Sequence, residues 1–119
     1  RSEVVSCDCA VVLDDTLFGD PVKNGLKPGA TVIINTTKDK ALFAIDGVQV
    51  VTVDATGLAL EILGRPITNV PLLGALIAAT GITSIPAVEA AIDDQLAPKL
   101  REKNKKLLNK TYEIVKEAL

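Results

Sequence analysis

The chain has 119 residues, of which 48% are hydrophobic and 24% charged, and its net charge is −2. These values are typical of one globular domain that can bury a core, and the weak net charge gives no general reason to bind nucleic acid or an anionic membrane. Aromatic residues make up only 3%, so aliphatic side chains must fill the core, as in a covered parallel sheet. We therefore predict a single α/β domain over residues 1–119, with a three-layer open sheet, mostly parallel, and C-terminal helices.

The N-terminal part of the chain predicts two buried strands. The β-branched run at 9–13 is typical of a strand, and the acids that follow it suit a loop or a helix cap. We expect a short helix or turn over 16–26 and a tight turn at 27–29. The second strand is expected over 31–35, where the sequence reads TVIIN.

Residues 36–53 allow two interpretations. Asp46-Gly47 between apolar runs is typical of a hairpin. The alternative is a short helix over 38–45, with Gly47 past its end, followed by a strand over 48–53. We favour the alternative, because it preserves the strand–crossover–strand order of a parallel sheet.

The rest of the chain predicts helices with clear end signals. Asp54 or Thr56 caps a helix that ends at Gly64. A mostly apolar helix is expected over 72–80, and Gly81 ends it. Another helix begins at Ser84 and Pro86 and is broken by Pro98. Inner-face positions of these helices are expected to be Leu58, Ala59, Ile62, Leu63, Val88, Ala91, Ile92 and Leu96.

A basic amphipathic helix is predicted over 98–119. One face is expected to hold Leu100, Leu107, Leu108, Thr111, Val115 and Leu119. The lysines are expected to stay in water, among them Lys103, Lys105, Lys106 and Lys110. This segment has seven Lys or Arg against three Asp or Glu and so carries +4, whereas the remaining six bases and twelve acids give −6. A basic helix on an acidic body is suited to docking on itself or on a partner.

The residues indicate no catalytic or metal site. The sequence has no His, and its two cysteines, Cys7 and Cys9, are too few for a tetrahedral zinc site. Positions two apart on a strand face the same way and do not easily form a disulfide, so we expect reduced, packed thiols. The glycines form neither a dinucleotide fingerprint nor a phosphate loop.

Polar residues at two places remain as candidates. Asp14-Asp15 follow a predicted strand, where ligands of open α/β sheets collect, although helix capping is the favoured role. Arg65 lies in a Gly-Arg-Pro turn and can hold an anionic group or a partner carboxylate, or remain solvated. Asn69 is expected to cap the next helix or to bond a neighbouring chain. The predicted interface consists of Arg65, Asn69, Leu72 and Leu73, within the segment 64–82.

Several stretches of the sequence together resemble a known family. They are "VVLDDTL" at 11–17, "GLKPGATVIINT" at 25–36, "VDAT" at 53–56, "LALEILGRPITNVPLLGALIAATG" at 58–81 and "SIPAVEAAIDDQL" at 84–96. These residues resemble the gamma subunit of the 2-oxoacid:ferredoxin oxidoreductases, of pyruvate or branched-chain oxoacid type. Two features depart from that family: Gly57 stands where an acid is usual, and the family's N-terminal glycine-rich loop is absent. The chain is therefore expected to be the C-terminal part of a longer gamma subunit.

The resemblance implies a non-catalytic role in a cytoplasmic, hetero-oligomeric enzyme. Such enzymes use thiamine diphosphate and 4Fe-4S clusters to convert a 2-oxoacid, here expected to be pyruvate, into acyl-coenzyme A, and they reduce ferredoxin. The implied partners are alpha, beta and delta subunits, and this chain is expected to bind none of these cofactors alone but to help assemble the complex and shape its coenzyme A side. Two alternatives are a standalone doubly wound domain that binds a nucleotide or other ligand near Asp14 and Thr36, and a pure assembly scaffold.

Overall fold

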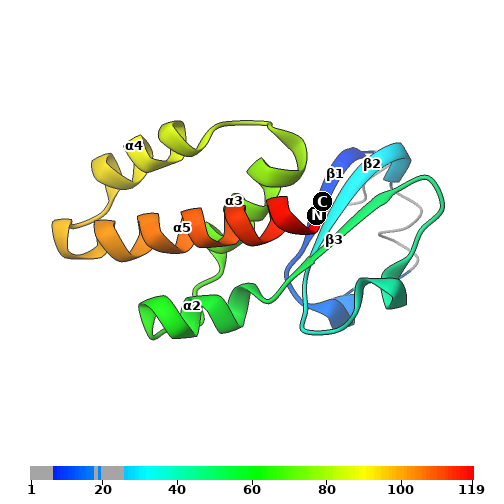
Figure 1. Cartoon of the computed structure of the whole chain (residues 1–119), viewed down its shortest axis with the longest axis horizontal. Coiled ribbons are helices and arrows are strands. Elements are labelled where there is room, and N and C mark those ends of the chain that lie inside the picture. Colours follow the sequence, from blue (N-terminus) through cyan, green and yellow to red (C-terminus); the bar gives the residue numbers. More distant parts are fainter. Residues whose placement is uncertain (1–6, 18, 20–25) are drawn as a thin grey trace. The chain divides into compact units, whose positions relative to one another are not determined.

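The computed structural model describes residues 7–17, 19 and 26–119. The chain divides into two compact units, Arg1–Val53 and Asp54–Leu119. The first unit contains a β-sheet, and the second contains helices α2 to α5 (Figure 1). An open sheet followed by C-terminal helices confirms the predicted α/β class.

The sheet of the first unit has the order β1-β2-β3, with β1 at Cys7–Val12, β2 at Leu26–Asn35 and β3 at Gln49–Val53. Both neighbouring pairs are parallel. Two 3-10 turns follow β1 and β2, namely η1 (Asp15–Leu17) and η2 (Lys40–Phe43). The parallel pairing of β2 with β3 confirms the crossover interpretation over the hairpin.

One predicted element in this unit is wrong, and the predicted helix or turn over 16–26 lies largely outside the described residues. The short helix expected over 38–45 is present but shorter, as the 3-10 helix η2, which Asp39 caps by accepting a hydrogen bond from the N–H of Ala41 at 2.9 Å. The tight turn expected at 27–29 is part of β2. Gly29 adopts a φ of +85°, which glycine tolerates and which bends the strand locally. At this kink the chain stays in β2, and the register between β1 and β2 shifts.

One hydrophobic cluster of the first unit lies on one face of the sheet. Its buried members are Val12, Val32, Ile34 and Phe43, and Ala10, Leu26, Val48 and Val50 pack against them. Residues 30–34 of β2 are buried without alternation, as expected for the central strand of a parallel sheet. The register pairs Ala10 with Val32 and Val32 with Val50, which brings these side chains to the same face.

The second unit consists of α2 (Ala55–Leu63), α3 (Asn69–Thr80), α4 (Ile85–Gln95) and α5 (Pro98–Ala118), and α5 contacts each of the other three. The predicted end signals are confirmed. Carboxylate and hydroxyl oxygens of Asp54 and Ser84 cap α2 and α4, and left-handed glycines end α2 and α3. The core comprises Ile77, Ile92 and Leu108, against which Val70, Leu73, Ile85, Val88, Leu96 and Tyr112 pack.

The inner face of α5 is shorter than predicted. Its buried members are Asn104, Leu107, Leu108, Thr111 and Val115. Leu100 and Leu119 were expected on this face but are 44% and 56% exposed, because they belong to the two ends of the helix. Lys105 is half-buried rather than exposed, because its Nζ pairs with Asp93 Oδ1 of α4 at 2.7 Å. This hydrogen bond raises the pKa of Lys105.

Helices α3 and α5 approach each other at Gly74. A Cβ atom at this position would lie 2.7 Å from the backbone oxygen of Leu108 and 3.3 Å from Cβ of Thr111. Such a distance to backbone is too short for a side chain, so only glycine permits this crossing. The hydroxyl of Thr111, fully buried beside it, donates to the Leu107 carbonyl at 2.9 Å.

Candidate functional site

Polar side chains gather where the strands of the sheet end. Thr36 directly follows β2, and its Oγ1 donates to Asp15 Oδ2 at 2.6 Å and accepts from the N–H of Lys38 at 3.0 Å. Lys38 Nζ lies 3.7 Å from Asp15 Oδ1. The Nδ2 of Asn35 donates to the Leu13 carbonyl at 3.1 Å. The carboxyl ends of β1 and β2 are therefore joined by side-chain hydrogen bonds.

Asp14 makes a separate local contact at the same edge. Its Oδ1 accepts hydrogen bonds from the backbone N–H and the hydroxyl of Thr16, both at 3.0 Å. These bonds favour the carboxylate and hold the pKa of Asp14 below its usual value. A carboxyl that stays ionised at neutral pH is a poor general acid, and its position two residues before Thr16 matches the favoured capping role.

The two predicted crevice residues thus lie at the same edge, each engaged locally. Thr36 is 7% exposed, and its hydroxyl both donates and accepts, whereas Asp14 is exposed. Asp15 and Lys38 complete the cluster. The predicted capping pair includes Asp15, whereas no role is predicted for Lys38, although a lysine three residues after the end of a strand is a signal that the sequence contains.

The predicted interface residues differ in exposure. Arg65 follows α2, Asn69 is the first residue of α3, and both are exposed. Leu72 is only 4% exposed, and Leu73 is half-buried against the core of the second unit. The expected capping by Asn69 is wrong, because Thr68 occupies the N-cap position and makes no side-chain capping bond.

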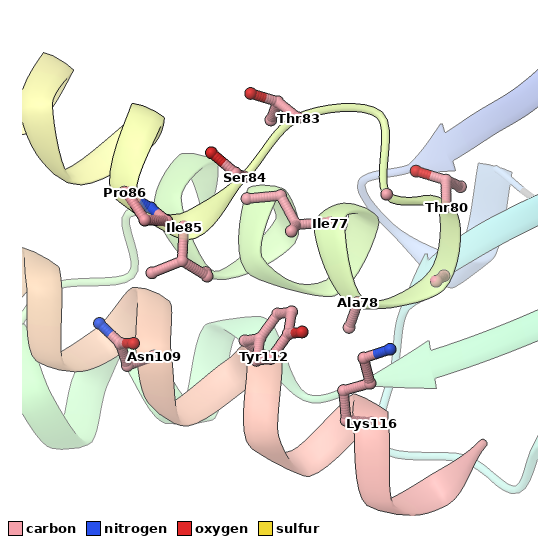
Figure 2. A pocket seen from close by; sticks show the side chains of 12 residues that line it. Ile77, Ala78, Thr80, Thr83, Ser84, Ile85, Pro86, Asn109, Tyr112 and Lys116 are labelled. Carbon is pink, nitrogen blue, oxygen red and sulfur yellow. The ribbon is translucent and has the colours of Figure 1, made fainter.

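The second unit has a groove of about 720 Å³ that the sequence did not predict. Figure 2 shows Tyr112 and Lys116 of α5 below it, with Ile77 and Ala78 of α3 and the start of α4 around it. The Nζ of Lys116 lies 5.9 Å from the centre of the Tyr112 ring, a cation–π distance. The walls of the groove come from segments about 30 residues apart in the sequence, so no local motif predicts it.

The hydroxyls of this groove are turned to nearby backbone. Thr80 Oγ1 donates to the Leu76 carbonyl at 2.7 Å and accepts from the N–H of Ile82 at 3.2 Å, and Ser84 Oγ accepts from the N–H of Ala87 at 3.2 Å. No carboxylate, thiol or imidazole lines the groove. Nucleophilic catalysis needs a nucleophile beside a base, and the lining residues of the groove do not supply that pair.

The donor set does not fit an iron–sulfur cluster. A 4Fe-4S cluster needs four thiolates, and the sequence has two cysteines. Cys9 is half-buried. Among residues 7–17, 19 and 26–119, no three His, Cys, Asp or Glu side chains are grouped so as to hold a metal ion. No helix in the described part of the chain is long and apolar enough to span a membrane.

Comparison with known proteins places these features in a family. The family described as "Pyruvate ferredoxin/flavodoxin oxidoreductase" matches residues 1–114. A "Pyruvate/ketoisovalerate oxidoreductases common subunit gamma" from Thermococcus litoralis is 42% identical over 118 residues, which cover 95% of this chain and 64% of the relative. A "Pyruvate synthase subunit PorC" from Methanocaldococcus jannaschii is also 42% identical, over 94% of this chain and 62% of the relative.

Solved structures agree with the sequence matches. The pyruvate oxidoreductase subunit PORC of Thermotoga maritima has a TM-score of 0.85 at 34% identity, covering 92% of this chain and 64% of that one. The keto/oxoacid ferredoxin oxidoreductase gamma subunit of Geobacter sulfurreducens has a TM-score of 0.74 at 26% identity. The chain thus spans somewhat less than two thirds of the relatives it matches. It belongs to the pyruvate ferredoxin/flavodoxin oxidoreductase family.

Proposed function

We propose that this chain is the C-terminal part of the gamma subunit of a cytoplasmic 2-oxoacid:ferredoxin oxidoreductase that acts on pyruvate. The observation that carries the proposal is the family match over residues 1–114, together with relatives named as gamma subunits that are 42% identical. The stretches between residues 11 and 96 that resemble the gamma subunit family support the same assignment.

Within that enzyme, the chain acts by packing rather than by chemistry. Thiamine diphosphate supplies decarboxylation and iron–sulfur clusters carry electrons toward ferredoxin in such an enzyme. The two cysteines and absent histidine support the assignment of those cofactors to the alpha, beta and delta chains. The polar groups at the sheet edge bond one another, which supports a structural role for them. Shaping the coenzyme A side of the complex is part of this proposal.

The proposed contact surface surrounds the connection from α2 to α3. Arg65 and Asn69 are exposed polar side chains there, and Leu60 and Ile67 expose 49% and 48% of their surface. Apolar side chains with a few charged groups among them are typical of subunit interfaces, where Arg is enriched. Leu72 and Leu73 support the surface from beneath, because they are buried or half-buried.

Charge reversal at Arg65 tests this surface. The full gamma chain carrying Arg65→Glu would be co-expressed with the alpha, beta and delta chains, and co-purification would be compared with thermal unfolding of the isolated chain. We expect weaker co-purification with little change in unfolding, since an exposed charge contributes less than about 1 kcal/mol to folding. Lys40→Glu reverses an exposed charge in the first unit and serves as control.

The outcomes separate the subunit proposal from its alternatives. Lower unfolding temperature with normal assembly would make Arg65 an internal structural residue. Failure of the wild-type chain to join the complex, or to support pyruvate- and coenzyme A-dependent ferredoxin reduction, would contradict the subunit proposal. Nucleotide binding by the isolated chain, lost in Thr36→Val, would favour the standalone ligand-binding domain instead.

A further inference from the structure

Helix α5 carries a row of positive charges on its outer side. Lys99, Lys103, Lys106 and Lys110, here called the lysine stripe, recur at spacings of four, three and four residues, and all four are exposed. Residues at these spacings lie on one face of a helix. With a rise of 1.5 Å per residue, the stripe is about 16 Å long.

Packing of the opposite face fixes the direction of the stripe. Leu107, Leu108, Thr111 and Val115 are buried on the inner side of α5, so the helix cannot rotate without exposing them. Lys105 lies outside the stripe and pairs with Asp93 of α4. The four stripe lysines are thus held outward by the fold, and their charges are available to a partner.

The charge order along α5 works against the helix itself. Its first nine residues, 98–106, hold five cations and one acid, whereas Glu113 and Glu117 lie in the last turns. A helix dipole favours the reverse order, with acids at the N-terminus and cations at the C-terminus. Like charges spaced four apart also repel one another. Fold stability therefore does not explain the stripe, and residues kept at a cost to stability are typical of functional surfaces.

We propose that the lysine stripe docks an acidic surface of a partner protein. Lysine ammonium groups on flexible stems match clusters of Asp and Glu, and such charges accelerate and orient association. The stripe lacks the interleaved aromatic side chains that stack nucleic-acid bases. The apolar face of α5 is packed inside its own unit, so the helix cannot lie on a lipid surface by that face.

The test uses the full chain and poly-L-glutamate as the acidic probe. Binding of fluorescently labelled poly-L-glutamate would be measured by anisotropy for wild type, for the stripe variant Lys103→Gln/Lys106→Gln and for the control Lys40→Gln/Lys116→Gln, which removes two exposed charges elsewhere. We expect the stripe variant to bind about threefold or more weakly, given the modest energy of exposed ion pairs, and the control to stay within about twofold. Raising the salt concentration should weaken wild-type binding most.

Thermal unfolding and competing ligands provide further tests of the lysine stripe. Because the stripe opposes the helix dipole, the stripe variant should unfold at the same or a higher temperature than wild type. A lower temperature would make the stripe a structural feature. Equal losses in both variants, or tighter wild-type binding to poly(U) RNA or phosphatidylglycerol vesicles than to poly-L-glutamate, would overturn the proposal. So would self-association of the wild type that the stripe variant abolishes in sedimentation.

Discussion

The two units of the chain organise their interiors differently. The sheet unit places its polar groups at one edge, where Asp15 bonds Thr36 and Lys38 across 21 or more residues of sequence. The helical unit relies on close apolar contact, with Gly74 of α3 against the backbone of α5 at Leu108. Buried hydrogen bonds contribute about 1 kcal/mol each, whereas a fully buried side chain contributes several. We therefore expect substitutions in the core of the helical unit to cost more than substitutions of the polar groups at the sheet edge.

Leu108→Ala is expected to have the largest effect and tests the helical side of the comparison. Leu108 is fully buried and belongs to the core with Ile77 and Ile92. Its truncation should lower the free energy of unfolding by about 2–5 kcal/mol, because it loses apolar burial and leaves a cavity. Urea denaturation followed by circular dichroism measures this change. Leu100→Ala on the same helix is the control, and an equal loss in both variants would contradict the packing described.

Gly74→Ala tests the close crossing of α3 and α5. The added methyl group would meet the Leu108 carbonyl, and such overpacking costs about 1–3 kcal/mol, against a gain of about 1 kcal/mol in helix propensity. We therefore expect a net loss of up to about 2 kcal/mol in the same denaturation experiment. Gly57→Ala is a comparison rather than a neutral control, since its methyl group would meet no backbone atom but would displace the Asp54 carboxylate that caps α2. A stability gain in Gly74→Ala would show that the helices can separate freely.

Thr36→Val tests the hydrogen bonds at the sheet edge. Valine keeps the shape but removes the hydroxyl that donates to Asp15 and accepts from the N–H of Lys38. Leaving these partners unsatisfied should cost about 1–2 kcal/mol. Thr37→Val, one residue further and exposed, should change little. If Thr36→Val costs as much as Leu108→Ala, the proposed difference between the units is wrong.

Acid titration gives the smallest expected effect. The pKa of Asp14 is lowered by hydrogen bonds from Thr16, so the folded chain binds that proton less readily than the unfolded chain. Its contribution is present above the unfolded pKa of about 4 and is lost as the pH falls through the folded value. Asp14→Asn should therefore flatten the decrease in unfolding temperature as the pH falls below about 4. If Asp14→Asn leaves the decrease in unfolding temperature at low pH unchanged, Asp14 does not contribute to the acid sensitivity of the fold.

Local signals made most helix ends and strands predictable. Asp54, Ser84, Gly64 and Gly81 act within a few residues of themselves, so the caps follow from sequence alone. The run at 31–35 has three consecutive β-branched apolar residues at 32–34 and predicts the central strand. The parallel pairing of β3 was predicted from the alternation of strands and crossovers along the chain. Asp46-Gly47 is a local hairpin signal, but β2 and β3 do not form a hairpin.

Features that depend on distant residues were not predictable. The 27–29 kink belongs to β2 because pairing with β1 extends past it, which a Lys-Pro-Gly sequence does not reveal. Asn69 does not cap α3 because the helix already includes it, and Thr68 is therefore the N-cap residue. The groove and the Gly74 contact join α3 to α5 across about 30 residues, and helix periodicity specifies a face without specifying its partner.

The position of Tyr112 gives the chain a built-in optical reporter. Tyr112 is the one tyrosine of the sequence, which has no tryptophan, so near-ultraviolet emission excited at the tyrosine band comes from a single site. Its ring is half-buried against the core of the second unit, and Lys116 lies over it. Quenching by a neutral solute such as acrylamide would therefore follow the opening of the α3–α5 groove without any label.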